Sequence, residues 1–575
     1  MNPEARTTAA HHFLAGLAEA GLEYLFCNLG TDHVSLIEAM AQFAREGRRH
    51  PEVVLCPHEN VAIHMAGGYA AVTGRGQGVL VHVDAGTANA AMGMHNLFRS
   101  RWPVLLMAGR SPFTLRGELT GSRDNYVHFV QDPFDIASLV RPYVKWEYTL
   151  ASGVVAKEVL RRAHTVMHSD PPGPVFLTLP RETLAEACDA EVASFPAERF
   201  GPVRAGGIPA GAAREIARAL VQARKPIVVT SYLGRRPEAV AALEALAAEC
   251  GIRVHEFMPT ALSVSRDAPC FGGFDPAQGL AGADLCLLLD VDVPWLPKFT
   301  GPDAGTRFLH IDIDPLKQDF PMWGFATDLR LQADCAAALA DILQAVRTLA
   351  DDDFRARVAQ RTAGWSRERD ERLRAVAVAG AAPGARGAIA PAFVCATLNR
   401  ALSQDDLVVN EAIRNSPAVL AQIHRTRAGT LLGCSGGGLG YSGGMALGAK
   451  LARPAQRVVQ VCGDGGFHFS TPTSVYAVAQ RAKLPILTVV LDNGGWQAVK
   501  EAVLRVYPEG EAARANQFHA RLDGEVRRFD RVAEAFGAHG EYVDAPEDLE
   551  QALQRSLQAV DGGRAAVLHV KVGGT

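Results

Sequence analysis

Two short apolar runs, each stopping at glycine beside a polar residue, constrain the fold of this chain most. Residues 458–462 lead into Gly-Asp-Gly-Gly at 463–466, and the β-branched run 489–491 leads into Asp-Asn-Gly-Gly at 492–495. Between them, Thr471-Pro472 suits an N-cap and a first helical residue, followed by apolar residues at helical spacing. The pattern predicts a strand, a glycine turn, a helix and a second strand. Ligands bind at the carboxyl edge of such parallel sheets.

The polar groups at that edge suit only a few kinds of ligand. Asp464 offers a carboxylate and Asn493 an amide oxygen, both ligands suited to Mg²⁺ or Ca²⁺. Because glycine has no side chain, the N–H groups of Gly465 and Gly466 can approach a phosphate. These groups predict a metal-anchored diphosphate site. An ordinary tight turn after a buried strand is the alternative interpretation.

Gly-Asp-Gly followed about one βα unit later by Asn resembles the thiamine diphosphate motif of the 2-oxo acid decarboxylase and acetolactate synthase family. The interval here is slightly longer than is usual in the family, which places the extra residues at 470–473, and Asp492 stands where a first Asn is usual. The resemblance implies thiamine diphosphate and Mg²⁺ as cofactors. It assigns the cofactor's diphosphate end to Gly463, Asp464, Gly465, Gly466, Asn493 and Gly495, with Asp464, Asn493 and Gly495 on the metal.

Length and composition limit the class of protein. A chain of 575 residues is too long for one hydrophobic core, and its 21% charged and 48% hydrophobic residues are typical of globular proteins. The net charge of −4, with no basic cluster, argues against nucleic acid as a partner. No apolar run suits a signal peptide or a membrane span, so we expect a soluble, cytoplasmic protein. Ten cysteines without a Cys-x-x-Cys pair fit reduced thiols.

Strand-like and helix-like stretches alternate along the whole chain, which predicts an α/β fold. The expected strands outside the opening unit are 24–26, 53–55, 79–83, 104–107, 175–179, 227–230, 285–289, 308–311 and 407–409. We expect three doubly wound parallel-sheet domains at 1–190, 205–350 and 388–575, with linkers at 191–209 and 351–387. The family resemblance implies that these are the pyrimidine-binding, central Rossmann-like and diphosphate-binding domains.

Cofactor chemistry predicts a second site. Thiamine diphosphate is active only when its pyrimidine ring is protonated at N1′, so the protein must bury a carboxylate against that atom. Glu59, in His58-Glu59-Asn60 after the strand at 53–55, resembles the glutamate that serves the family in this way. An acidic residue early in a helix is also common as a surface charge that complements the helix dipole, which is the alternative.

Two loops complete the cofactor site that the resemblance implies. The first is Gly436-Gly437-Gly438-Leu439-Gly440. In the family, the residue that corresponds to Leu439 wedges between the two cofactor rings. The carbonyl that corresponds to that of Gly437 accepts a hydrogen bond from the 4′-amino group. The segment Asn410-Glu411-Ala412-Ile413-Arg414 matches the family's loop under the diphosphate, most like the benzoylformate decarboxylase branch. Arg414 stands where a small hydroxyl residue is usual, and it either pairs with a phosphate or faces solvent.

Substrate-side residues follow the first and third expected strands. Thr31, Asp32 and His33 lie where relatives place residues that face the reacting carbon. His82 is in register with a proton-transferring histidine of benzoylformate decarboxylases, and a hydrogen-bonded core histidine is the alternative. Arg110 stands where acetolactate synthases usually have Gln, and it can supply a cation for a substrate carboxylate.

The resemblance implies decarboxylation of a small-molecule 2-oxo acid through an enamine that is then protonated or added to a second carbonyl. Two alternatives stay open: an acetolactate-synthase-like carboligase, with FAD as a further cofactor that no sequence signature indicates, and an inactive nucleotide-binding homologue. In related enzymes the active site lies between subunits, so the resemblance also implies a homodimer or homotetramer.

Overall fold

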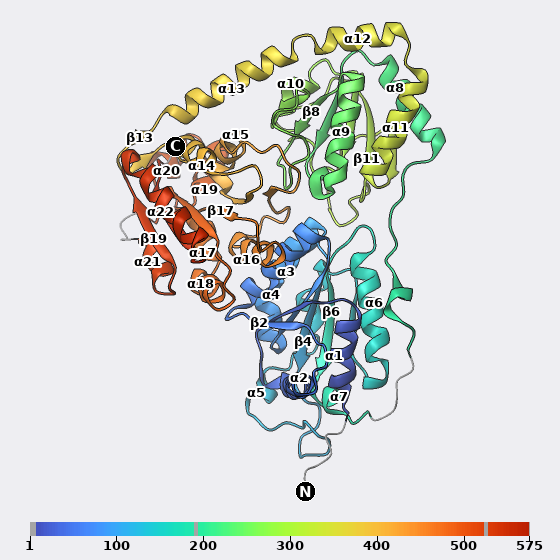
Figure 1. Ribbon diagram of the computed structural model, residues 1–575, viewed down its shortest axis with the longest axis vertical. Helices are drawn as coiled ribbons and strands as arrows, with labels where there is room; N and C mark the ends of the chain where they lie inside the picture. The colour runs from blue at the N-terminus through green and yellow to red at the C-terminus, as the bar shows by residue number, and fades with distance from the viewer. Residues whose placement is uncertain (1–6, 189–193, 523–526, 574–575) are drawn as a thin grey trace.

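The computed structural model describes residues 7–188, 194–522 and 527–573. Three six-stranded sheets, each wholly parallel and flanked by helices, form three lobes: blue, green and orange-red in Figure 1. The predicted α/β class with three parallel sheets is confirmed. No helix among the described residues is both long and apolar enough to cross a bilayer.

The first sheet has the order β2-β1-β3-β4-β6-β5. Its strands are β1 Tyr24–Cys27, β2 Glu52–Leu55, β3 Gln77–Val81, β4 Val104–Arg110, β5 Glu147–Thr149 and β6 Val175–Pro180. Its helices are α1 Ala9–Glu19, α2 Val34–Glu46, α3 Glu59–Thr73, α4 Val83–Ser100, α5 Val127–Val130, α6 Ala156–His168 and α7 Arg181–Ala185. The strand predicted at 79–83 is too long: it ends at Val81, and His82 is the N-cap residue of α4. The alternation of apolar residues continues past the turn, which hid the boundary.

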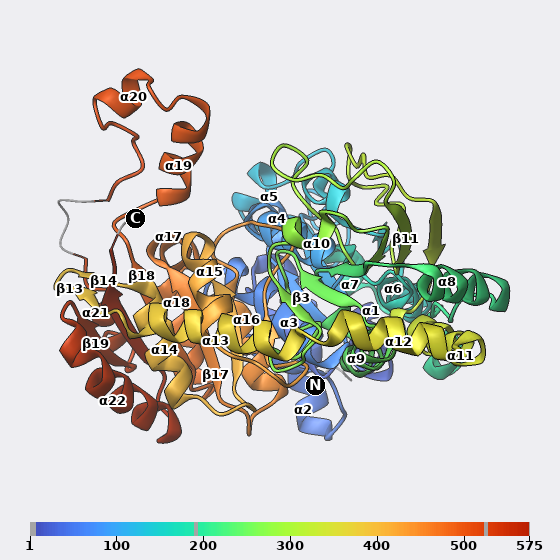
Figure 2. The same cartoon turned by 90° about the horizontal axis from the view of Figure 1, so that it is seen from above.

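The second sheet has the order β12-β11-β10-β7-β8-β9. Its strands are β7 Pro226–Thr230, β8 Arg253–Glu256, β9 Phe271–Gly273, β10 Leu285–Leu289, β11 Arg307–Asp312 and β12 Leu329–Gln332. Its helices are α8 Ala210–Gln222, α9 Pro237–Cys250, α10 Ala277–Leu280 and α11 Cys335–Leu349. The stretch at 351–387, predicted as a linker, contains two helices, α12 Asp352–Thr362 and α13 Trp365–Ala381. Helix α13 crosses from the second lobe to the third (Figures 1 and 2). Of the other predicted linker, residues 191–193 lie outside the described residues.

The third sheet has the order β16-β15-β17-β18-β20-β19. Its strands are β15 Leu407–Glu411, β16 Leu431–Leu432, β17 Val458–Gly463, β18 Leu487–Asp492, β19 His539–Val543 and β20 Ala566–Lys571, after the small hairpin β13 Gly384–Ala385 and β14 Ala388–Ile389. Its helices are α14 Pro391–Ala401, α15 Ser416–Gln422, α16 Ser442–Ala452, α17 Asp464–Phe469, α18 Pro472–Arg481, α19 Gln497–Val506, α20 Glu511–Arg514, α21 Phe529–Glu534 and α22 Leu549–Asp561. Figure 2 shows α19 and α20 extending away from the sheet.

The predicted glycine turn at 463–466 is the start of a short helix, α17. Pro472 occupies the first turn of α18 as predicted, but the side chain of Thr471 does not cap that helix. Thr471 adopts a left-handed conformation with φ +53°, and its hydroxyl donates to the carbonyl of Ser470. Because α17 already follows the strand, the chain must bend sharply at 470–471 to begin α18.

Helices α3 and α16 join the first lobe to the third through glycines. A Cβ at Gly448 would lie 2.0 Å from the carbonyl oxygen of Met65, and one at Gly68 would lie 2.2 Å from that of Met445. The two helix backbones therefore touch directly. Since α3 begins at Glu59 and α16 follows the Gly-rich loop at 436–440, this contact fixes the two predicted cofactor segments relative to each other.

Gly448→Val tests this contact. We expect it to lower the free energy of unfolding by about 3 kcal/mol, because backbone cannot move aside for the added side chain. Urea unfolding would measure the change. The matched control is Gly211→Val on α8, where an added Cβ meets open space. Equal losses in the two variants would contradict the backbone contact.

Candidate active site

Asp464 and Asn493 lie together because they follow adjacent parallel strands, β17 and β18, which pair as Gly463 with Leu491. Asp464 is 2% exposed, so its carboxylate is nearly removed from water. The side-chain oxygen of Asn493 is buried and has no hydrogen-bond partner among the described residues. A carboxylate beside an unpartnered amide oxygen is a donor set that suits a hard cation such as Mg²⁺.

Arg527 lies across this pair of strand ends, a contact that no motif in the sequence indicates. Its guanidinium is 3.1 Å from Asp464 Oδ2 and 2.9 Å from Asp492 Oδ1. Burial and the neighbouring Asp492 raise the pKa of Asp464 to about 6. Burial would also raise the pKa of Asp492, but the hydrogen bond with His569 and the charge of Arg527 outweigh it and lower that pKa. In the single chain, Arg527 thus partly neutralises a buried acidic pair.

The glycines around Asp464 are explained by packing. A Cβ at Gly465 would lie 3.0 Å from the indole nitrogen of Trp496, and one at Gly466 would lie 3.1 Å from the carboxyl carbon of Glu411. Gly463 differs, because a Cβ there meets no atom within 4 Å. The open side at this strand end is therefore beside Gly463.

Gly495 is held in a conformation that only glycine adopts readily. Its φ is +142°, and a Cβ would lie 2.1 Å from the carbonyl oxygen of Ala520. Its own carbonyl oxygen accepts from the N–H of Gln497 at 3.0 Å, which leaves the second lone pair of that oxygen for another partner. The backbone of this loop is thus fixed next to Asn493.

The segment at 410–414 is tied into its own surroundings. Asn410 donates to the hydroxyl of Ser416 at 2.9 Å and accepts from the N–H of Ala412. Glu411 is fully buried, and its carboxylate accepts from the N–H groups of Gly440 and Ser442. Glu411 therefore supports the turn that follows the Gly-rich loop, and burial raises its pKa.

Arg414 forms an ion pair with Glu501 of α19. The pairing joins the loop after β15 to the helix after Gly495, two segments at the carboxyl edge of the third sheet. The Arg414 side chain is also 33% exposed, and its pairing with a phosphate stays a prediction.

The Gly-rich loop packs on α4 of the first lobe. Asn96 exchanges two hydrogen bonds of 3.0 Å with Gly438, and His95 lies 2.7 Å from the carbonyl oxygen of Gly436. Gly437 is exposed with φ +76°, and Leu439 is partly buried. The loop that resembles the family's ring wedge is thus held by both lobes.

Glu59 is the first residue of α3 and is 7% exposed. Asn89, on α4, donates to its carboxylate at 3.0 Å. The other carboxylate oxygen faces Gly86, where a Cβ would lie 3.2 Å away. Glu59 is therefore a nearly buried acid whose carboxylate is oriented by a hydrogen bond, and the interpretation as a surface charge is wrong. Helix α4 carries partners of both sites: Asn89 bonds to Glu59, and His95 and Asn96, six and seven residues further along the helix, contact the Gly-rich loop.

His82 and Asp32 form a close pair. His82 Nδ1 lies 2.6 Å from Asp32 Oδ1, and its Nε2 lies 3.0 Å from the side-chain oxygen of Gln131. A Cβ at Gly109 would lie 1.7 Å from Asp32, so only glycine makes room for the pair. The His82 side chain keeps 22% exposure, which argues against the alternative of a core histidine.

The pKa values of His82 and Asp32 are shifted in opposite directions. The hydrogen bond that His82 donates to the Asp32 carboxylate raises the pKa of His82. Burial opposes ionisation of Asp32, but the hydrogen bond with His82 and the charge of His33 outweigh it and lower the Asp32 pKa. Asp32 and His33 are 1% and 0% exposed; Asp32 contacts His82, and His33 Nε2 lies 3.2 Å from Asp32 Oδ2. Thr31 is exposed and bonded to His128 at 3.0 Å.

Asp32→Asn tests the origin of the His82 pKa. We expect the pKa to fall, because an amide does not stabilise the imidazolium as a carboxylate does. NMR titration of the imidazole would measure it, with Asp84→Asn as the control for a more distant charge. The stability that Asp32 provides through His82 is full below the ordinary pKa of 6.5 and disappears as pH rises through the raised value. An unshifted His82 pKa in Asp32→Asn would contradict the pairing.

Arg110, at the end of β4, is partly exposed and lies 3.7 Å from Asp132. That carboxylate already pairs with Arg123 at 2.5 Å. Arg110 therefore keeps much of its hydrogen-bonding capacity for an anion at the carboxyl edge of the first sheet.

The chain thus places the predicted residues in two groups, one at the edge of the first sheet around Glu59 and His82, and one at the edge of the third around Asp464. Two cavities of about 580 and 610 Å³ lie elsewhere, in the second lobe and between lobes. The sequence-based reasoning did not find three partners in these groups: Asn89, Gln131 and Arg527. Asn89 lies seven residues after His82 in the sequence, whereas the other two carried no local signal.

Comparisons with known proteins show which families and relatives the chain resembles. Residues 7–139 match the N-terminal, and residues 415–570 the C-terminal, TPP-binding domain of the thiamine pyrophosphate enzymes. The chain is 26% identical to a benzoylformate decarboxylase of Pseudomonas aeruginosa, over 94% of this chain and 95% of the relative. It is 24% identical to an acetolactate synthase of Bacillus subtilis, over 94% and 90%.

Solved structures share the fold. A 4-hydroxybenzoylformate decarboxylase of Rhodococcus jostii superposes with a TM-score of 0.75 at 20% identity, covering 99% of this chain and 100% of that one. A benzoylformate decarboxylase of Polynucleobacter necessarius gives a TM-score of 0.77 at 18% identity, covering 99% of each chain.

Proposed function

Because the chain belongs to the thiamine pyrophosphate enzymes and carries both cofactor-binding domains of that family, we propose that it decarboxylates a small 2-oxo acid with thiamine diphosphate and Mg²⁺. The observation that carries the proposal is the buried, unpartnered oxygen of Asn493 beside the Asp464 carboxylate. Asp464 is met by the Arg527 guanidinium, whereas the Asn493 oxygen has no donor among the described residues, so a cation at these adjacent strand ends would supply the missing partner.

The cofactor-binding roles follow from the same edge of the sheet. Asp464, Asn493 and the carbonyl of Gly495 would hold Mg²⁺, and the open side of Gly463 would receive the diphosphate. Gly437 and Leu439 would contact the rings. Glu411 supports that loop from behind, and Gly465 and Gly466 allow the close packing around it. Asn410 and Arg414 border the site through the loop after β15.

Thiamine diphosphate, when bound, supplies a thiazolium carbon that adds to a keto group and accepts the electron pair released with CO₂. Glu59 would hold a proton at the pyrimidine nitrogen, and Asn89 would keep its carboxylate oriented by the 3.0 Å hydrogen bond. The burial of Glu59 excludes water from that contact.

His82 would move the second proton. Its side chain is 22% exposed and its Nε2 lies 3.0 Å from the Gln131 side-chain oxygen, while Asp32 stabilises the imidazolium through Nδ1. Thr31 and Arg110 would border the substrate, with Arg110 facing its carboxylate. Asp32 and His33 act behind His82 as positioning residues.

We propose that two copies of the chain complete each site. Apolar side chains are exposed near both groups of residues: Phe129 (56%) and Phe134 (109%) in the first lobe, and Val506 (60%) and Tyr507 (65%) beside α19. Exposed apolar clusters of this kind are typical of surfaces that a partner covers. A homodimer or homotetramer would bury them, and sedimentation of the purified protein would determine which.

The deciding experiment is CO₂ release from a panel of aliphatic and aromatic 2-oxo acids, with and without thiamine diphosphate and Mg²⁺, and with the products identified. We expect cofactor-dependent CO₂ and an aldehyde product. A coupled hydroxy-ketone would identify a carboligase, and visible flavin absorbance in the purified protein would add FAD. No turnover of any acid would contradict the proposed activity.

A further inference from the structure

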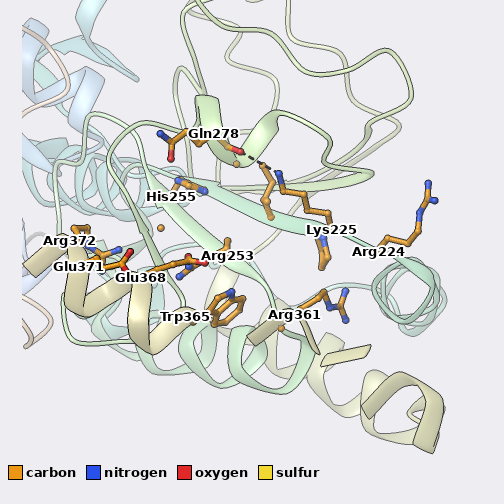
Figure 3. A pocket seen from close by; sticks show the side chains of 15 residues that line it. Arg224, Lys225, Arg253, His255, Gln278, Arg361, Trp365, Glu368, Glu371 and Arg372 are labelled. Carbon is orange, nitrogen blue, oxygen red and sulfur yellow. Dashed lines mark hydrogen bonds and ion pairs between the residues drawn. The ribbon is translucent and has the colours of Figure 1, made fainter. Parts of the chain in front are cut away.

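A cavity of about 580 Å³ lies in the second lobe, between the amino ends of β7 and β8 and the helices α12 and α13 (Figure 3). It is at the edge of the sheet opposite to the carboxyl ends, where ligands of parallel sheets usually bind. Its charged and aromatic lining includes Arg224, Lys225, Arg253, Arg361, Trp365 and Arg372. The volume is within the range of small-molecule sites.

Two arginines in this cavity have unused hydrogen-bond donors. Arg361 donates from Nη1 to the carbonyl of Ala223 at 3.0 Å, but its Nε and Nη2 are buried without a partner. Arg372 donates from Nη1 to the carbonyl of Phe271 at 2.9 Å, but its Nη2 is buried without one. Burial lowers the pKa of both groups. Buried guanidinium donors without an acceptor are costly, so an anion here would stabilise the site.

His255 adds a second unpartnered group. It is 4% exposed, and neither ring nitrogen has a hydrogen-bond partner among the described residues. Burial and Arg253 lower its pKa to about 4, so the neutral ring offers one donor and one acceptor. The ring packs on Gly272 and Gly279, where a Cβ would lie 2.6 and 2.3 Å from it.

The acidic side chains near the cavity are already paired. Glu368 pairs with Arg253, whose guanidinium also lies 4.7 Å over the ring of Trp365, and Glu371 lies 3.8 Å from Arg367. The buried donors of Arg361 and Arg372 therefore have no carboxylate of their own. The excess charge in the cavity is positive.

We propose that this cavity binds a phosphate-bearing small molecule of about nucleotide size. Guanidinium groups match the geometry of phosphate oxygens, and the unused donors come from two arginines on different helices, α12 and α13. Because α13 also packs on the third lobe, where Gln422 donates to the carbonyl of Val376 at 2.9 Å, the ligand would be held by the helix that connects the lobes.

The test uses the full chain saturated with thiamine diphosphate and Mg²⁺, so that the diphosphate site is filled. Calorimetric titration with ADP, inorganic pyrophosphate, adenosine and citrate would measure affinity. We expect saturable binding of ADP and pyrophosphate, with adenosine and citrate at least about tenfold weaker, because charge-assisted hydrogen bonds to phosphate dominate.

Two variants locate the site. Arg361→Gln with Arg372→Gln should weaken ADP binding at least about tenfold, whereas Arg374→Gln, at an exposed arginine of α13 outside the cavity, should leave it unchanged. If the double glutamine variant does not fold, Arg361→Lys with Arg372→Lys keeps the positive charge. It should still weaken ADP binding, because lysine lacks the two parallel N–H donors of a guanidinium. Any of three results would overturn the proposal: ADP and pyrophosphate do not bind, adenosine or citrate binds as tightly as ADP, or the double variant folds and keeps the wild-type affinity for ADP.

Discussion

Replacing Glu59 by Gln lowers kcat for CO₂ release by at least about a hundredfold while thiamine diphosphate remains bound. The two side chains have nearly the same volume, so the hydrogen bond to Asn89 and the packing of α3 persist. Only the proton exchange at the pyrimidine nitrogen is lost, and general acid–base groups of this kind contribute about 10²–10⁴-fold.

Turnover and cofactor affinity must be measured separately to interpret this variant. CO₂ release gives kcat, and equilibrium dialysis gives the amount of thiamine diphosphate bound. Glu52→Gln is the matched control, because Glu52 is an exposed acid on the strand before α3. If Glu59→Gln kept half of the wild-type turnover, Glu59 would not be the catalytic acid. An inactive nucleotide-binding homologue would show no turnover in either protein.

Replacing Asp464 by Asn weakens thiamine diphosphate binding by at least about a hundredfold at fixed Mg²⁺. The change removes the only charged donor from the proposed metal site and leaves Arg527 paired with Asp492 alone. Metal affinity depends on ionised ligands, and the diphosphate is held largely through the metal.

Tryptophan fluorescence offers a direct readout, because Trp496 lies against Gly465. Cofactor titration should quench it in the wild-type chain and not in Asp464→Asn over the same range. The matched control is Asp561→Asn, whose carboxylate is 55% exposed and pairs with Arg457 away from the site. Equal affinities for the cofactor in wild type and Asp464→Asn would exclude Asp464 as a metal ligand.

Local pattern was enough to predict much of this fold. The strands at 227–230 and 285–289 were found to within one residue, because buried parallel strands are continuous apolar runs that end at glycine or a polar residue. The same property located Asp464 and Asn493, since strand ends in a parallel sheet meet at one edge. Boundaries failed where the pattern continued through a turn, as at His82, and where a helix began directly at a strand end, as at Asp464.

The amino-acid sequence by itself determined the three α/β units, the strand ends that carry Asp464 and Asn493, and the segment that carries Glu59. Only the tertiary structure decided which groups meet: Asp32 with His82, Arg527 with Asp464, and the unpartnered donors of the second-lobe cavity. The physical reason is the separation along the chain over which the interactions act. Backbone conformation follows from neighbours a few residues away, whereas the partner of a buried charge is set by packing between segments that are 50 or more residues apart in the chain.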